Sequence, residues 1–428
     1  MRIHIIASIG VALIAGGISA CTDLTALEQV NPGQVSAATL YVPSNAQLLV
    51  NGAISDFECA YTRYVVGSGL LIDELSNAIG STANFDFDAR RLTTNATYGT
   101  GVCGSNQQPP IYTTLSTARG SADTVLAYLR TWTDASMPAG VNRTRLAGQA
   151  AAYAGYSLVL LGEGMCTAAV NLSAELTPTQ LFGEAKIRFD SAVTAATTVN
   201  DVATLNLALL GRARTLLNLK QAAAAGTDAA RVPTTFVANT GTDNVSVRRQ
   251  NFAFLSINQN QWSTVEAAFR GVTIGGSPDP RVAVTNTGRT GTAQGSQVWT
   301  PDKYPFLTTP MPIARSAEAQ LIVAEAKQAA GDLTGAAQAI NAVRATRTGV
   351  PVYDVTGQTS DQVLATIIED RRRELFLEGH RLGDIRRYVL PLTPSAGTAY
   401  PGGGGAYGTQ SCFPLPDVER VNNPNIAK

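Results

Sequence analysis

The chain has 428 residues, of which 45% are hydrophobic and 15% charged, and its formal net charge at pH 7 is zero. A chain of this length can bury a large core or two subdomains. The balanced charge gives no support for binding to nucleic acid or to an anionic membrane surface. Lysine is scarce, whereas Ala, Thr, Gly and Asn are abundant, which suits a secreted protein with many polar loops.

Residues 1–20 have the pattern of a secretory signal peptide. Arg2 precedes an apolar run from Ile5 to Ile18, which is too short to cross a bilayer comfortably, and small residues follow it. The segment ends with small residues before Cys21, as in the cleavage site of a bacterial lipoprotein. We therefore expect removal of residues 1–20 and lipidation of Cys21. The alternative is an ordinary signal peptide followed by a chance cysteine.

The residues after Cys21 indicate where the anchor is and how it joins the rest of the chain. Thr22 follows the cysteine in place of the aspartate associated with retention in the inner membrane, so the outer membrane is favoured. Residues 21–45 contain the turn signals Asn31-Pro-Gly33 and Pro43-Ser-Asn45 and show little periodicity. We interpret residues 21–45 as a lipid-anchored tether.

Apart from Cys21, the chain has four cysteines: Cys59, Cys103, Cys166 and Cys412. Their spacing matches no zinc or redox pattern, and an even number in an oxidising compartment indicates disulfides. Four cysteines allow three connectivities. We favour Cys59–Cys103, which lies within the N-terminal region, and Cys166–Cys412, which would staple the tail.

Apolar residues at helical spacing dominate the first half of the chain. They predict helices over 46–75, 111–131, 142–161, from about 179, and 201–225. Gly162 ends one of these helices, and Thr177-Pro178 begins the next. The order of helix, short turn and helix resembles tetratricopeptide-repeat pairs, although no strict period of about 34 residues is present. A generic helical bundle is the alternative.

Residues 232–310 differ from the helical part in composition. Thr, Gly, Asn, Gln and Pro dominate, and helical periodicity fades except around Trp262 to Phe269. The stretch is too long for a plain connection in a compact domain. Because aromatic ring faces on polar loops suit carbohydrate or peptide capture, we predict Trp262, Trp299 and Tyr304 as ligand contacts. A small satellite core under long loops is the alternative.

Helical spacing returns over 313–326, over 333–346 and from about 360, and leads into a charged stretch at 369–388. More than half of the residues in this stretch are charged, against 15% in the whole chain, and every cation in it is Arg. Gly379 interrupts the spacing, so we expect two helices that meet at Gly379-His380. Arg forms forked bonds to carboxylates, so a polar network that locks the two helices is one interpretation and a solvated face is the other.

Within that network we expect opposite charges to meet inside one helical turn, as in Glu369 with Arg373 and Glu378 with Arg381. The residues to which we assign this structural role are Arg371, Arg372, Arg373, Glu374, Glu378, Gly379, His380, Arg381, Asp384 and Arg387.

The string Arg-Arg-Arg-Glu-Leu-Phe-Leu-Glu-Gly-His-Arg-Leu-Gly-Asp-Ile-Arg-Arg at 371–387 closely resembles the C-terminal signature of the SusD/RagB family. The helix with Arg315-Ser-Ala-Glu318, the helix with Ile340-Asn-Ala-Val-Arg344 and the Pro- and Asn-rich tail resemble other segments of that family. The resemblance is strongest over 310–428. Between about 46 and 310 it depends on helical pattern and order.

The resemblance implies a mostly α fold, with a tetratricopeptide-repeat-like scaffold over 46–428 that carries a loop-rich insertion at 232–310 and a C-terminal signature region at 311–428. It implies a lipid-anchored, surface-exposed protein of the outer membrane that captures an oligosaccharide or peptide without covalent chemistry. The implied partner is a SusC-like TonB-dependent outer-membrane transporter, whose mouth the protein would cover as a lid. The signature carries no ligand residue of the family.

Two other functions are compatible with the sequence. One is a structural interaction subunit without its own ligand site. The other is a glycoside hydrolase, for which Asp73, Glu74, Asp86 and Asp88 are the candidate carboxylates. After removal of the signal peptide one histidine is left, His380, which argues against a Ser-His-Asp triad or a histidine-rich metal site. We therefore expect no catalytic residue, metal or cofactor.

Overall fold

The computed structural model describes residues 35–80, 82–104, 107–293, 295 and 297–427. The described residues fall into two units, which divide between Val42 and Pro43. In the first, Ser36 caps the short helix α1 (Ala37–Leu40). The predicted signal peptide, the lipidation site Cys21 and most of the tether lie outside the described residues. Among the helices that are described, none is both long and apolar enough to cross a membrane.

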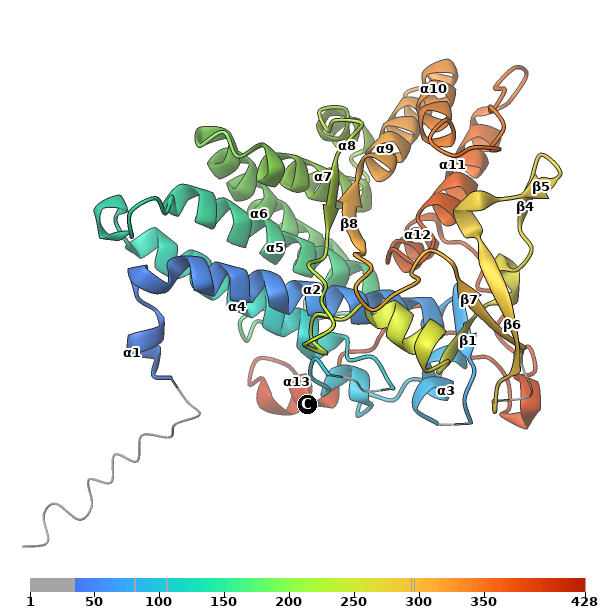
Figure 1. Ribbon diagram of the computed structural model, residues 1–428, viewed down its shortest axis with the longest axis horizontal. Coiled ribbons are helices and arrows are strands. Elements are labelled where there is room, and N and C mark those ends of the chain that lie inside the picture. The colour runs from blue at the N-terminus through green and yellow to red at the C-terminus, as the bar shows by residue number, and fades with distance from the viewer. Residues whose placement is uncertain (1–34, 81, 105–106, 294, 296, 428) are drawn as a thin grey trace, which may run out of the picture. The chain divides into compact units, whose positions relative to one another are not determined.

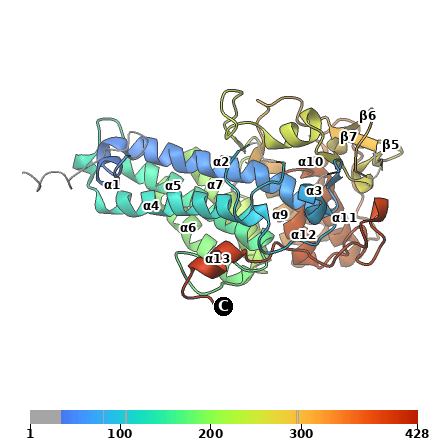
Figure 2. The ribbon, with the colours of Figure 1, turned by 90° about the horizontal axis from the view of Figure 1, so that it is seen from below.

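The second unit begins with a bundle of long helices, in which α2, α4, α5, α6, α7 and α8 follow one another along the chain and pack in order (Figures 1 and 2). Their bounds are α2 (Ala46–Leu71), α4 (Tyr112–Thr131), α5 (Arg143–Gly164), α6 (Pro178–Thr198), α7 (Val202–Asn218) and α8 (Ala222–Ala229). A short helix, α3 (Thr82–Asp88), follows α2. The predicted succession of helix, turn and helix is therefore present.

Local sequence explains how these helices start and why they approach closely. Thr177 accepts a hydrogen bond from the backbone N–H of Gln180, whose side chain bonds back to Thr177, and Pro178 occupies the first turn. Small residues let neighbouring helices meet: a Cβ added at Gly155 would lie 2.8 Å from the ring of Phe189. The predicted start of α6 is confirmed.

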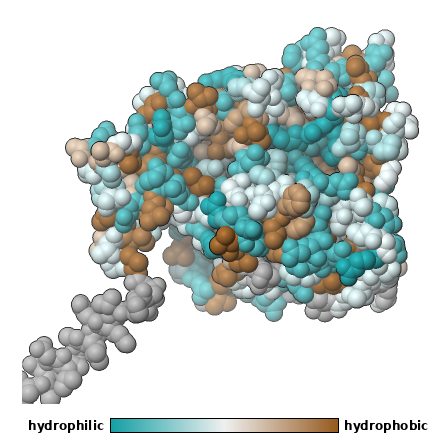
Figure 3. All heavy atoms as spheres, viewed as in Figure 1, coloured by the Kyte–Doolittle hydropathy of each residue, from teal (hydrophilic) through white to brown (hydrophobic). Residues whose placement is uncertain are grey.

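The helices resume near the C-terminus and pack onto the end of the bundle through the contact of α8 with α9. They are α9 (Ser316–Ala329), α10 (Leu333–Arg344), α11 (Ser360–Glu374), α12 (Arg381–Tyr388) and α13 (Asp417–Asn422). A large hydrophobic core runs from the N-terminal helices to the tail, and a smaller one lies where α9, α10 and α11 meet. Over the surface in Figure 3, hydrophobic and hydrophilic residues are intermixed.

Short strands and single helical turns lie between α8 and α9, and β1, which follows α2, pairs with one of these strands. Antiparallel pairs join β1 to β3, β2 to β8, β4 to β5 and β6 to β7. The strands are β1 (Leu75–Asn77), β2 (Val237–Asn239), β3 (Ser263–Val265), β4 (Thr273–Ile274), β5 (Ser277–Pro278), β6 (Val284–Thr290), β7 (Gln297–Pro301) and β8 (Pro312–Arg315). A π-helix spans Phe254–Gln259.

Two sequence predictions of helices are wrong. The helix expected over 201–225 is divided into α7 and α8, because the chain turns through Lys220, whose φ is +61°. The stretch from Trp262 to Phe269 forms β3 and a 3-10 turn, because residues 263–265 pair with β1. That pairing is a long-range contact, which overrides local periodicity.

Both predicted disulfides are confirmed. Cys59 in α2 is bonded to Cys103 in the loop before α4. Cys166, just after α5, is bonded to Cys412 in the tail. The tail also accepts a hydrogen bond at the Phe413 carbonyl from the Cys166 N–H, so the last residues are fixed against the end of α5.

Candidate functional site: the charged signature, its pocket and the tryptophan sheet

The charged signature forms two helices, as predicted. α11 ends at Glu374 and α12 begins at Arg381. Between them Gly379 has φ +71°, a conformation that side chains with a Cβ rarely adopt, and it lies against the ring of Tyr64 in α2. The bend therefore directs the two helices of the signature against the bundle.

Arginine side chains of the signature are buried in ion pairs. Arg371 bonds Asp384 at 2.9 Å, and Arg381 bonds Asp73 at 2.6 Å. Arg387 pairs with Glu325 and also lies 3.3 Å from Asp384. Arg371 is 4% exposed and Asp384 is also 4% exposed. The polar network is thus the correct interpretation of the signature, and the solvated face is wrong.

Glu374, the last residue of α11, and Glu378, in the bend after it, connect the signature to residues before it. Glu374 accepts hydrogen bonds from Arg315 and Arg347 at 2.8 and 2.7 Å. Glu378 accepts one from Arg315 at 2.8 Å and another from Lys303. Burial alone would raise the pKa of Glu378, but Arg315 and Lys303 hold it below its ordinary value.

Of the two pairs expected inside one helical turn, one is confirmed and one is wrong. Arg373 lies 2.5 Å from Glu369, as predicted. Glu378 does not pair with Arg381. The bend at Gly379 separates these two residues, so Arg381 faces Asp73 after α2 while Glu378 faces Arg315 at the end of β8.

His380 and Glu318 occupy the centre of the network. Burial and the nearby cations Arg214 and Arg371 lower the pKa of His380 well below 6.5, so the imidazole is neutral. Its Nδ1 lies 3.7 Å from Oε1 of Glu318, a contact that is not an ion pair while the imidazole is neutral. Burial raises the pKa of Glu318 to about 7, although Arg214 and Arg371 act to lower it.

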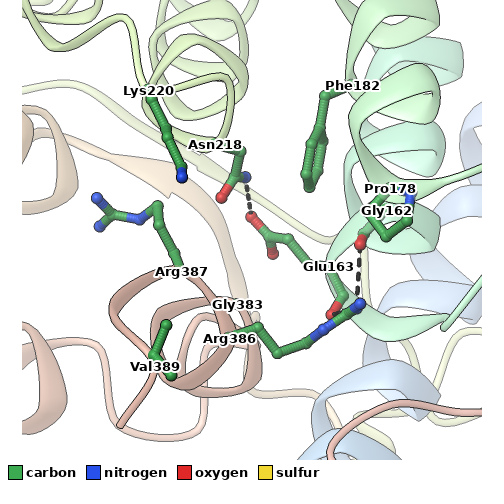
Figure 4. A pocket seen from close by; sticks show the side chains of 10 residues that line it. All are labelled: Gly162, Glu163, Pro178, Phe182, Asn218, Lys220, Gly383, Arg386, Arg387 and Val389. Carbon is green, nitrogen blue, oxygen red and sulfur yellow. Dashed lines mark hydrogen bonds between the residues drawn. The ribbon is translucent and has the colours of Figure 1, made fainter.

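A pocket of about 230 Å³ lies beside α12 (Figure 4). It is bounded by the end of α5, the start of α6, the end of α7 and the last turn of α12. Ten residues line it: Gly162, Glu163, Pro178, Phe182, Asn218, Lys220, Gly383, Arg386, Arg387 and Val389. Sequence analysis did not identify this pocket, because its four walls are far apart in the chain.

Two sets of hydrogen bonds shape the walls of the pocket. Glu163 accepts bonds from Arg214 at 2.8 and 2.5 Å and from the Asn218 amide at 2.8 Å. Arg386 donates through Nη1 to the carbonyls of Gly162, Glu163 and Met165, which end α5. A cation at this place satisfies carbonyls that lack partners within the helix and complements the negative end of the helix dipole.

The two predicted tryptophans lie on adjacent strands of the insertion. Trp299 is in β7, Trp262 directly precedes β3, and these two strands pack against each other. The Trp262 carbonyl accepts hydrogen bonds from the Ala78 N–H at 3.0 Å and from the Asn84 amide at 3.2 Å. Both tryptophans are half-buried. We call this region, β1, β3, β6 and β7 with the two indoles, the tryptophan sheet.

Tyr304 requires a correction. It is 1% exposed, and its hydroxyl donates to the Leu377 carbonyl at 2.9 Å. A ligand on the surface does not reach a side chain in this position, so the prediction of Tyr304 as a ligand contact is wrong. Tyr304 belongs to the large hydrophobic core, and its hydroxyl is bonded to the bend of the signature.

Three of the four carboxylates considered for hydrolysis are buried. Asp73 is occupied by Arg381, and Glu74 accepts a hydrogen bond from the Leu377 N–H at 2.9 Å, with its pKa raised by burial to about 8. Asp88 accepts bonds from the Asn77 N–H at 2.7 Å and the Tyr400 hydroxyl at 2.8 Å. Asp86 is half-buried. The buried three are placed to hold the fold rather than to meet a polysaccharide.

No group of three or more His, Cys, Asp or Glu side chains that could hold a metal ion occurs in the part of the chain that the structure describes.

Comparison with known proteins gives a family match over the C-terminal part of the chain and a shared fold over most of it. Residues 238–426 match the model of the SusD family. No curated protein matches the chain. A SusD-like carbohydrate binding protein from Bacteroides vulgatus ATCC 8482 has 17% identity and a TM-score of 0.66, covering 89% of this chain and 96% of that chain. Surface glycan-binding protein A from Bacteroides thetaiotaomicron has 13% identity and a TM-score of 0.66, with coverage of 89% and 97%.

A structure of the same Bacteroides thetaiotaomicron protein in complex with laminarihexaose matches with 13% identity and a TM-score of 0.66, covering 89% of this chain and 98% of that chain. At these identities the likeness establishes the fold alone. The mostly helical, tetratricopeptide-repeat-like scaffold expected from the sequence is confirmed.

Replacing Glu378 by Gln should lower the free energy of unfolding by about 3–5 kcal/mol, because Lys303 would lose the carboxylate that pairs with it and Arg315 would keep only its pair with Glu374. Replacing Glu369, which is 40% exposed, should cost about 1 kcal/mol or less, and it serves as the control. Arg373→Gln should likewise lower stability. Urea unfolding followed by circular dichroism measures these differences. Weaker ligand binding without loss of stability in the Glu378 variant would contradict the structural role.

Replacing Glu318 by Gln should change how stability depends on pH. The pKa of Glu318 is about 7 in the folded protein, against 4.5 for the ordinary group. The folded state therefore binds this proton more tightly, and the resulting stability is fully present below pH 4.5 and lost as pH rises through 7. Since Gln stays neutral, the variant should match the wild type at about pH 4 and exceed it at pH 8.5, on the order of 1–3 kcal/mol.

Urea unfolding at both pH values measures this difference between variant and wild type. The comparison cancels the other buried acids, Glu74 and Asp88, whose pKa values are also raised by burial. Glu184→Gln, a change at a half-exposed glutamate, is the control. An unchanged pH dependence in the Glu318 variant would show that Glu318 is ionised throughout.

Proposed function

This chain belongs to the SusD/RagB family, and from that premise we propose that it captures a nutrient glycan at the bacterial surface and acts as a lid for a TonB-dependent transporter. The observation that carries the proposal is the match over nearly the whole length of a glycan-binding relative, including its complex with laminarihexaose. Binding would need no covalent step. Capture and release are sufficient for delivery to a transporter.

The tryptophan sheet is the part of the molecule that best suits a sugar. Trp262 and Trp299 are half-buried, so each indole is fixed by packing and still has exposed area. Sugar rings present apolar C–H faces that stack on such rings, and polar groups around them provide orientation. Arg270 lies 5.9 Å from the centre of the Trp299 ring, so a cation is already placed next to one indole.

Amide side chains belong to residues near the two tryptophans in the chain or are bonded to the backbone next to them. Gln261 directly precedes Trp262 and is half-buried, whereas Asn84, which donates to the Trp262 carbonyl, is fully buried and fixes the backbone at the indole. Asn258 donates to the carbonyl of Pro301, at the end of β7. Amides both donate and accept hydrogen bonds without carrying charge, which suits the hydroxyl groups of a neutral glycan. The combination of fixed aromatic faces and amides supports a ligand site on the tryptophan sheet.

The proposal includes the domain organisation and the membrane anchor. Residues 1–20 would be removed, Cys21 would carry the lipid, and residues 21–45 would connect the anchor to the structured domain over 46–428. The insertion at 232–310 would present the ligand site, and the region 311–428 would hold the scaffold together. In this arrangement the signature contributes to function only by keeping the tryptophan sheet in place.

Replacing Trp262 or Trp299 by Ala should weaken glycan binding about tenfold or more, because an aromatic stacking face is lost. The control is Trp132→Ala, at the end of α4 and outside the tryptophan sheet, which should leave affinity unchanged. A screen of oligosaccharides, with laminarihexaose among them, and of peptides identifies the ligand, and calorimetry then measures the affinities. Binding of no member of the screen would favour a structural subunit over a receptor.

The anchor and the partner can be tested in the native membrane. The wild-type protein should fractionate with outer membranes and co-purify with a TonB-dependent transporter. Cys21→Ser should release it from the membrane fraction, because no acyl chain would be attached. A transporter gene beside the gene for this chain would support the lid function. Co-purification with no transporter would contradict it.

A further inference from the structure

The pocket beside α12 has the size and position of a second ligand site, separate from the tryptophan sheet. Its volume of about 230 Å³ lies below the range of about 300–1,000 Å³ typical of sites for drug-sized molecules. It therefore suits a molecule of the size of a single sugar unit. Its walls belong to four different helices and their ends, which gives it a rigid frame.

A free cation lies at the edge of this pocket. Lys220 is exposed, and no described residue forms an ion pair or a side-chain hydrogen bond with it. In Figure 4 its ammonium group points toward the pocket, next to the Asn218 amide. The backbone at Lys220 has φ +61°, and its N–H donates to the Leu217 carbonyl at 2.9 Å, so the turn that presents the side chain is held in place.

The carboxylate inside the pocket does not neutralise Lys220. Glu163 already accepts two bonds from Arg214 and one from Asn218, so its charge is balanced by the Arg214 guanidinium. Arg387 likewise forms ion pairs with Glu325 and Asp384. The charge that each of these residues brings to the pocket is thus compensated within the protein.

Arg386 is a second cation without a carboxylate partner among the described residues. Its Nη1 serves three backbone carbonyls, which carry only partial charge. Burial lowers the pKa of Arg386 below its ordinary value, although the nearby Tyr64 and Glu163 act to raise it. Together with Lys220 it leaves the pocket with an excess of positive charge.

The rest of the lining is apolar. Phe182 and Pro178 come from the first turns of α6, and Val389, which is 87% exposed, comes from the end of α12. A ligand that fits both the cation and the apolar walls has a negative group that contacts Lys220 and a compact body that packs against Phe182, Pro178 and Val389. We propose that the pocket binds a small organic acid through its carboxylate, with an acidic monosaccharide, free or at the end of a glycan, as the ligand class.

The test titrates the purified protein with glucuronate and galacturonate, and in parallel with glucose and galactose, by isothermal calorimetry. The acids should bind and the neutral sugars should not, because only the acids carry the carboxylate. Lys220→Gln should weaken binding of the acids about tenfold or more, since a charge-assisted hydrogen bond is lost. Lys220→Arg, which keeps the charge, should retain most of the affinity.

Two control variants make the result specific. Lys327→Gln removes another exposed lysine, which pairs with Asp332, and should leave the affinity unchanged. Trp262→Ala should also leave it unchanged, so that failure of the tryptophan-sheet site and failure of this pocket can be told apart. Lys220 is exposed, and thermal unfolding of the Lys220 variants should match the wild type.

Three outcomes would overturn the proposal. They are absence of binding by both acids, equal binding of acids and neutral sugars, and full affinity for the acids in the Lys220→Gln variant. Binding of the free acids with no binding of a glucuronate-terminated disaccharide would restrict the ligand to free acids. Binding of both would extend the site to the acidic ends of glycans.

Discussion

Burial of charge is the constraint on which the C-terminal half of this protein depends. Removing an ion from water costs several kcal/mol, and the cost is recovered only when a partner of opposite charge is held in good geometry. Arg371 with Asp384, Arg381 with Asp73, and Arg315 with Glu374 and Glu378 meet this condition across segments far apart in the chain. Each pair therefore specifies how two segments must dock.

Arginine suits this task because its planar guanidinium can bond two oxygens at once. Arg214 holds both oxygens of Glu163, and Arg381 holds both oxygens of Asp73. These contacts connect α7 to α5 and α12 to the end of α2. Asp73 directly precedes the β1 segment of the tryptophan sheet, and Glu163 lines the pocket. Rigidity at both proposed ligand sites thus comes from one set of buried contacts.

The sequence allowed most helices to be predicted, because their apolar faces repeat at helical spacing and their ends carry local signals such as Thr177-Pro178. It also indicated the bend at Gly379 and the Arg–carboxylate network. It did not indicate the β1–β3 pair, because the two strands are short and nearly 200 residues apart in the chain. The burial of Tyr304 and the pairing of Glu378 with Arg315 depend on how the bend packs, which local spacing does not contain.

The sequence by itself therefore determined the helical scaffold and the identity of the charged signature, and it favoured the observed disulfide pairs among three possible connectivities. The helices and the signature depend on residue type and on spacing within one or two helical turns. The disulfides depend on a choice among a small number of cysteine pairings. Only the tertiary structure decided which carboxylate each arginine meets, which aromatic residues keep exposed area, and where the pocket with Lys220 forms. Those features are set by contacts between distant segments, whose geometry is fixed only when the whole chain has packed.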